Sequence, residues 1–161
     1  MNARGVDWKK LVASLVICQL AGVMGAIFTT PSVPTWYATL EKPIFVPPSW
    51  TFSVVWTILY ILMGLALYLV WIKGWENTDV QTAISVFGLQ LFLNFLWSVL
   101  FFGMQSPIMG LIEIVFLWVA ILATIVLFYR VSKTAGLLLL PYIAWVTFAA
   151  YLNYYIFMLN P

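Results

Sequence analysis

The sequence contains no histidine, a single cysteine and few charged residues. The absence of histidine removes the commonest metal and haem ligand and the usual general base. With Cys18 alone, the chain can form neither an internal disulfide nor a CxxC motif. A formal net charge of +2 provides no strongly basic surface for a nucleic acid. We therefore predict no catalytic residue, no metal site, no cofactor and no nucleic-acid partner.

The small number of charged residues also indicates whether water or lipid surrounds the protein. Only 7% of the 161 residues are charged, 65% are hydrophobic and the mean hydropathy is +1.06, whereas a soluble domain carries about 25% charged residues. Unbroken apolar runs of about 20 residues favour helices over a barrel. We predict an all-α integral membrane bundle, one domain over residues 1–161, with five transmembrane helices at about residues 8–28, 50–72, 80–102, 108–129 and 135–159.

The first of these runs follows a charged N-terminal stretch and could be mistaken for a signal peptide. Thr29-Thr30-Pro31 is a poor cleavage site, so we interpret the run as a retained helix. Five spans place six of the seven cationic residues on one side of the bilayer and Lys42 on the other. The positive-inside rule then predicts an internal N-terminus and an external first loop. The six residues are Arg4, Lys9, Lys10, Lys73, Arg130 and Lys133.

Aromatic and carboxamide side chains recur at helical spacing in three of the spans. Buried carboxamides in lipid need partners, so these faces should turn inward together. Two interpretations stay open, namely hydrogen bonding between helices alone, or a cavity for a large, flat, mostly apolar ligand. The amount of aromatic surface favours the cavity. The faces consist of Phe52, Trp56, Tyr60 and Met63, of Gln90, Asn94, Trp97 and Phe101, and of Tyr142, Trp145, Ala149 and Asn153.

Two further features each allow a functional and a structural interpretation. Glu113 is the one carboxylate expected inside a span, where an ionisable group is either functional or shallow enough to reach interfacial water or a neighbouring helix. In the first span, small residues recur every fourth position, from Cys18 to Gly22 and Ala26. Such a stripe lets helices approach closely, either within the bundle or across a dimer.

The connection over residues 29–49 contains five prolines and three aromatic residues. Prolines restrict the backbone, and a loop of this length is usually functional when it is not disordered. We expect it to fold over the outer mouth of the bundle as a lid. The residues that define it are Trp36-Tyr37-x-x-Leu40-x-Lys42-Pro43-x-x-x-Pro47-Pro48-x-Trp50, followed by Trp56-x-x-Leu59-Tyr60-x-x-Met63-Gly64.

This pattern resembles the translocator protein family, which includes bacterial tryptophan-rich sensory proteins and mitochondrial peripheral-type benzodiazepine receptors. The resemblance covers nearly the whole chain, from about residue 22 to the end. Two more blocks carry it, Gln90-x-x-x-Asn94-x-x-Trp97-x-x-x-Phe101-Phe102-Gly103 and Leu140-Pro141-Tyr142-x-x-Trp145-x-x-Phe148-Ala149-x-x-Leu152-Asn153-Tyr154.

The resemblance implies a five-helix bundle that binds porphyrins, and in some members sterols, in a pocket capped by the first loop. It assigns Trp56, Asn94, Trp97, Trp145, Ala149 and Asn153 to the pocket and Tyr37, Pro47 and Trp50 to the lid. The helical faces add Tyr60 and Gln90 to the expected ligand-binding set, and the loop pattern adds Trp36, Lys42, Pro43 and Pro48 to the lid.

One departure bears on the ligand. The basic residue that follows Leu152-Asn153-Tyr154 in the animal sterol pattern is missing here, so we expect a tetrapyrrole such as protoporphyrin IX rather than a sterol. A prokaryotic-type protein of a bacterial or archaeal cell membrane fits this departure. The resemblance, together with the small-residue stripe, also predicts a homodimer.

We therefore expect a membrane receptor or transporter for porphyrins with a transport or regulatory role. Two alternatives remain. One is an enzyme that degrades porphyrin with light or oxygen. The pigment and oxygen would supply the chemistry, because no nucleophile–base pair in the sequence supports ordinary hydrolysis or transfer. The other is a structural or partner-binding membrane protein, in which the aromatic faces serve as packing.

Overall fold

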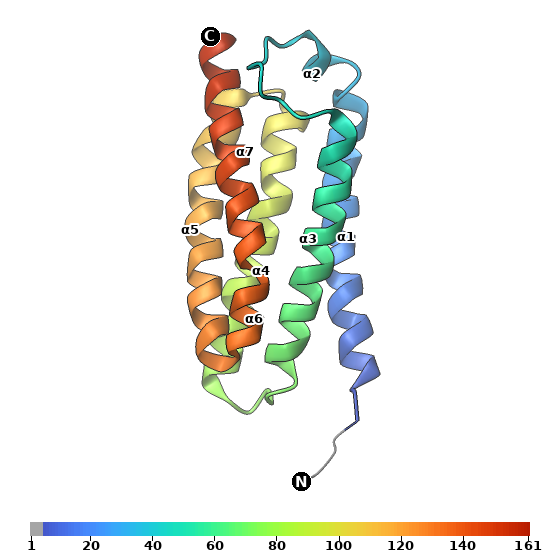
Figure 1. Ribbon diagram of the computed structural model, residues 1–161, viewed down its shortest axis with the longest axis vertical. Coiled ribbons are helices and arrows are strands. Elements are labelled where there is room, and N and C mark those ends of the chain that lie inside the picture. Colours follow the sequence, from blue (N-terminus) through green and yellow to red (C-terminus); the bar gives the residue numbers. More distant parts are fainter. Residues whose placement is uncertain (1–4) are drawn as a thin grey trace.

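Five apolar helical segments run side by side along the long axis of the computed structural model, which describes residues 5–161 (Figure 1). Each is long and apolar enough to cross a membrane, which confirms the predicted all-α membrane bundle. The spans are α1 (Trp8–Ser32), α3 (Ser49–Trp71), α4 (Thr78–Ser98) with the π-helix η1 (Val99–Gly103), α5 (Pro107–Val131), and α6 (Lys133–Leu138) with α7 (Leu140–Leu159). A short helix, α2 (Trp36–Thr39), lies in the first loop.

Local sequence signals explain where several helices begin. Asp7 accepts a hydrogen bond from the Lys10 N–H at 3.2 Å and caps α1, and Asn77 accepts one from the Asp79 N–H at 2.8 Å and caps α4. Ser106 caps α5, and Pro107 follows it at the first helical position, where its missing N–H costs nothing. These helix starts are therefore encoded by residues next to them.

Other boundaries differ from the expected ranges. The first helix continues past residue 28 to Ser32 despite Pro31 in its last turn, and the Ser32 hydroxyl donates to the Phe102 carbonyl at 2.9 Å. The expected loop therefore begins four residues late, at Val33. The last span is not one helix, since it is interrupted at Leu139, next to Pro141 of α7.

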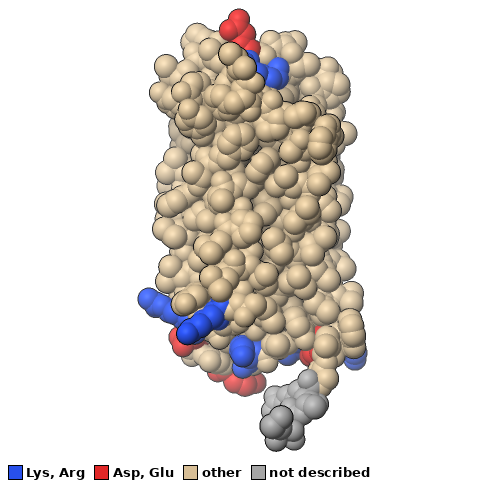
Figure 2. All heavy atoms as spheres, viewed as in Figure 1, with Lys and Arg blue, Asp and Glu red and all other residues tan. Residues whose placement is uncertain are grey.

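Charged side chains gather at the two ends of the bundle and leave its middle bare on the face shown in Figure 2. We call the end with the N-terminus and the α3–α4 loop the basic end, and the end with the first loop the lid end. Lys9, Lys10, Lys73, Arg130 and Lys133 sit on elements that meet at the basic end, whereas Lys42 belongs to the lid end. Arg4 lies outside the described residues. The side of the membrane that each end faces stays a prediction.

The helices form a closed ring whose two halves are filled differently. Around the ring, α1 packs against α3 and α4, α4 against α5, and α5 against α6 and α7, while α6 returns to α3. The half near the basic end is solid, with side chains such as Met63, Val70 and Phe128 fully buried. Close packing of this kind holds the helices at fixed distances there. Any cavity must lie toward the lid end.

Glycines set the closest approach of α1 to α3. A Cβ atom on Gly64 would lie 2.9 Å from the Leu15 Cα, and one on Gly22 would lie 2.6 Å from the Tyr60 ring. Gly25 similarly faces Ser98 of α4. Gly22 and Gly25 of α1 therefore pack within the bundle, and the predicted homodimer stays a prediction.

The Gly64 contact yields a stability prediction. Gly64→Ala should lower the midpoint of thermal unfolding in detergent, with a cost of about 1–3 kcal/mol, because the added methyl meets the backbone of α1. Gly88 of α4 is the matched control, since a Cβ atom there meets nothing within 4 Å. Gly88→Ala should leave the midpoint unchanged or raise it slightly. Equal effects of both substitutions would contradict the close approach.

Candidate functional site

A cavity of about 570 Å³ occupies the lid half of the bundle. All five spans and the first loop contribute to its wall, so it lies on the axis of the bundle. Eight residues predicted for the site or the lid line it. They are Tyr37, Trp50, Trp56, Tyr60, Asn94, Trp97, Ala149 and Asn153. The aromatic and carboxamide faces thus turn toward one common space.

A chain of hydrogen bonds closes the cavity toward the basic end. The Tyr60 hydroxyl donates to Asn94 Oδ1, and Asn94 Nδ2 donates to the Tyr142 hydroxyl oxygen at 2.9 Å. The Tyr142 hydroxyl donates in turn to Gln90 Oε1 at 2.8 Å. All four residues are buried. Because water and lipid cannot satisfy these groups, the chain ties α3, α4 and α7 into one floor.

A second polar contact lies higher in the cavity wall. Trp97 Nε1 donates to Asn153 Oδ1 at 3.2 Å, and Asn153 Nδ2 donates to the Pro107 carbonyl at 2.8 Å. The Trp97 ring stacks on Phe101 with centroids 4.9 Å apart. These contacts fix the indole at one side of the cavity. They also engage the oxygen and one N–H of Asn153 within the protein.

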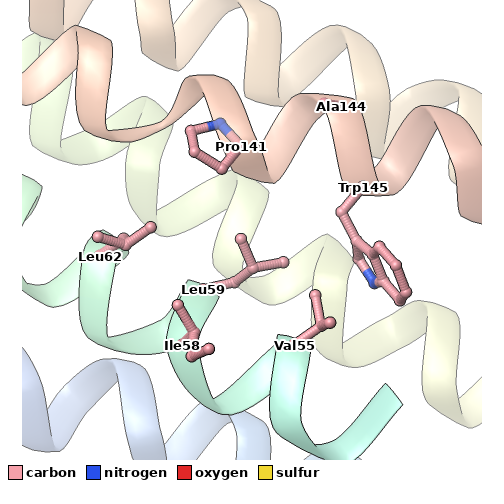
Figure 3. Close-up of a pocket in the computed structure, with 7 residues that line it drawn as sticks. All are labelled: Val55, Ile58, Leu59, Leu62, Pro141, Ala144 and Trp145. Atoms are coloured by element: carbon pink, nitrogen blue, oxygen red, sulfur yellow. The ribbon is translucent and has the colours of Figure 1, made fainter. Parts of the chain in front are cut away.

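Two residues of the predicted ligand set lie outside the cavity wall. Gln90 stands behind Tyr142 and supports the floor, with 1% of its surface exposed. Trp145 turns away from the cavity into a separate apolar groove of about 440 Å³ between α3 and α7 (Figure 3). Its ring contacts Phe52, a cavity residue, with centroids 5.6 Å apart. That ring pair separates the groove from the cavity.

The first loop covers the cavity and is anchored at both sides. Trp36 and Tyr37 pack on Phe101 and Phe102 of η1, with ring centroids 5.5–6.3 Å apart. Of the predicted lid residues, Tyr37 and Trp50 line the cavity, whereas Trp36, Lys42, Pro43, Pro47 and Pro48 do not. Lys42 Nζ lies 4.9 Å from the centre of the Tyr37 ring and donates to the Leu40 carbonyl at 2.8 Å. Burial raises the pKa of Tyr37 above its ordinary value.

The other side of the loop is fastened to the end of α7. Asn160 pairs with the backbone of Glu41, accepting its N–H at 3.0 Å and donating to its carbonyl at 2.9 Å. Phe45 stacks on Tyr151 and meets Tyr155 edge-on. We call this pair of hydrogen bonds between Asn160 and Glu41 the latch. Because the two residues lie 119 positions apart in the chain, no local sequence pattern predicts it. The expected lid is therefore an anchored loop above the cavity in the structure.

The cavity opens sideways between the lid halves of α1 and α3. Several residues that line it are also exposed at the bundle surface, which marks a lateral mouth. On α1 they are Val23, Ala26 and Thr30, and on α3 they are Ser53 and Thr57. Gln19 of α1 lines the cavity beside them and is half-buried. Our sequence analysis did not predict this wall of the cavity. The amide of Gln19, in the middle of an apolar span, was the signal that could have indicated it.

Glu113 is 5% exposed and is not part of the cavity wall. Neither of its carboxyl oxygens has a hydrogen-bond partner within residues 5–161. The interpretation that it reaches interfacial water or bonds a neighbouring helix therefore lacks support in this part of the chain. The carboxyl group remains a buried polar side chain inside a span.

Comparison with known proteins shows the family of the chain. Residues 14–159 match the model of the TspO/MBR family. The chain belongs to the TspO/MBR family. It is 50% identical over 152 residues to the tryptophan-rich protein TspO of Archaeoglobus fulgidus, a match that covers 94% of this chain and 97% of the relative. It is 34% identical over 148 residues to the translocator protein of Bos taurus, covering 91% and 88%.

Membership of the TspO/MBR family confirms the predicted resemblance and a multi-pass membrane protein. A tryptophan-rich protein TspO of Chlorobaculum tepidum is 48% identical over 94% of this chain and 96% of its own length. The matches include proteins of bacteria and archaea. The lid latch, the floor and the lateral mouth are features of the present structure.

The latch leads to a prediction about the lid. Asn160→Ala removes both hydrogen bonds to Glu41, so backbone amides of residues 36–47 should exchange with deuterium about 5–10-fold faster. Met158→Ala, at an exposed position in the last turn of α7, is the control and should leave the exchange unchanged. Unaltered exchange in Asn160→Ala would show that the aromatic contacts alone hold the lid.

Proposed function

We propose that this TspO/MBR family protein binds a tetrapyrrole such as protoporphyrin IX in the cavity beneath the lid, as a membrane receptor or transporter. The observation that carries the proposal is one cavity walled by flat aromatic rings and floored by ordered carboxamides. Its volume of about 570 Å³ lies within the range of about 300–1,000 Å³ that is typical of small-molecule sites.

The aromatic wall suits a planar ligand. Trp56 and Trp97 stand on different helices, and Tyr60 joins them from the floor. The Trp56 and Tyr60 rings lie 5.7 Å apart and are tilted by 30°, so together they offer a nearly continuous face. A macrocycle gains from such faces by offset stacking and by burial of its apolar surface. A sterol has no π face and would gain from burial alone.

The first prediction of the proposal concerns binding. Protoporphyrin IX added in the dark to protein in lipid nanodiscs should quench tryptophan fluorescence saturably. Ala149→Leu should weaken this binding at least about 10-fold, because the larger side chain takes up cavity space without removing a hydrogen bond. Ala144→Leu on the same helix is the matched control, because Ala144 lines the outer groove and not the cavity.

The control also tests the alternative location. Weaker binding in Ala144→Leu with unchanged binding in Ala149→Leu would place the ligand in the groove between α3 and α7 (Figure 3). Absence of saturable quenching in the unmodified protein would overturn the proposed function. Cholesterol added at increasing mole fraction should fail to displace the porphyrin.

We also propose that the N-terminus faces the cell interior and the lid the exterior. The support is the charge distribution, since five described cations lie at the basic end. In a Cys18→Ala background, Ile44→Cys in the lid should react with a membrane-impermeant maleimide added to intact cells. Glu76→Cys at the basic end should react only after the cells are opened. The reverse pattern would invert the topology.

A further inference from the structure

The lateral mouth between α1 and α3 has a polar rim formed by residues of two membrane-spanning helices. Gln19 stands near the middle of α1 and lines the cavity, and Ser53 and Thr57 on α3 are exposed residues that also line it. Polar side chains exposed to lipid are unfavourable, so they are rare unless they serve a cavity or a partner. The position of this rim therefore needs an explanation.

The hydrogen bonds of the cavity show which polar groups remain free for a ligand. Asn94 and Asn153 each have the oxygen and one N–H engaged within the protein, and the Thr57 hydroxyl donates to the Ser53 carbonyl at 2.8 Å. The Gln19 carboxamide takes part in no hydrogen bond within residues 5–161, and neither does the Ser53 hydroxyl. The rim thus offers more unused donors than the carboxamides deeper inside.

Packing below and above the rim favours the mouth as the route into the cavity. Toward the basic end, the close approach of Gly64 to Leu15 seals α1 against α3. Toward the lid end, the aromatic contacts of Trp36 and Tyr37 with η1 and the hydrogen bonds of Asn160 anchor the loop. The seam between α3 and α7 is blocked by the Phe52–Trp145 ring pair. Between α1 and α3, by contrast, cavity-lining residues of both helices, such as Ala26 and Ser53, are exposed at the bundle surface.

We propose that the ligand enters and leaves the cavity sideways from the bilayer, between α1 and α3, and that Gln19 and Ser53 bind its polar edge during passage. This inference rests on the proposed function. It adds a ligand class, an amphipathic planar molecule dissolved in the lipid that carries a carboxylate or carbonyl acceptor. The Gln19 N–H groups and the Ser53 hydroxyl donate to that acceptor while the apolar body slides between the helices.

A reversible block of the mouth tests the route. Ala26→Cys and Ser53→Cys are combined in a Cys18→Ala background and bridged with a bis-methanethiosulfonate reagent that a reductant can cleave. Rates of association and dissociation of protoporphyrin IX are measured in nanodiscs by stopped-flow tryptophan quenching. The bridge should slow both rates at least about 10-fold, with the equilibrium affinity changed less than about threefold, and reductant should restore them.

A matched block of the lid serves as the comparison. Glu41→Cys and Asn160→Cys, bridged in the same way, fasten the loop at the place where the latch already holds it. This bridge should change either rate less than about twofold. Each single-cysteine variant treated with a monofunctional reagent controls for modification alone. Slow exchange with the lid bridged and normal exchange with the mouth bridged would overturn the lateral route.

The role of the rim has its own test. Gln19→Leu should lower the association rate of protoporphyrin IX about 5–10-fold, because the apolar side chain offers no donor to the acceptor. Leu20→Ala, at an exposed position that does not line the cavity, is the control and should leave the rate unchanged. An unchanged rate in Gln19→Leu would remove Gln19 from the route. Absence of saturable binding in the unmodified protein would overturn the proposed function and this inference together.

Discussion

The hydrogen-bond chain from Tyr60 through Asn94 and Tyr142 to Gln90 is the constraint on which the rest of the structure depends. Within a bilayer, a carboxamide without a partner is costly, so Asn94 and Gln90 dictate which faces of α3, α4 and α7 meet. The chain crosses the bundle at one level. Below it the side chains pack solidly, and above it all five spans border an open space.

This division explains why the two ends of the protein differ. Near the basic end, glycine contacts between α1 and α3 allow close packing, and the helices cannot separate without losing it. Near the lid end, bulky rings such as Trp56 and Trp97 keep the helices apart and border the cavity. The loop then closes the top through aromatic contacts with η1 and through Asn160. The halves of the helices near the basic end are thus tightly packed, whereas the halves near the lid end border the cavity.

The polar groups of the site divide into those that build it and those that are free to meet a ligand. Asn153 and Asn94 were predicted to bind ligand, and both line the cavity, yet both also hold the structure together. Gln19 contributes nothing to that network and stands at the open side of the cavity. A substitution of Asn94 would therefore change packing and recognition together, whereas Gln19 can be changed with the floor left intact.

The sequence by itself determined the five spans, the caps at Asp7, Asn77 and Ser106, and the helical faces of Trp56 and Asn94, because hydropathy, capping and a 3.6-residue period are local properties. It could not determine that Trp145 turns into an outer groove, that Asn160 latches onto Glu41, or that Gln19 borders a mouth. Those facts depend on how helices distant in the chain are rotated and splayed against one another. Only the packing of the whole bundle decides that rotation, since each helix is apolar on several faces and lipid accepts any of them.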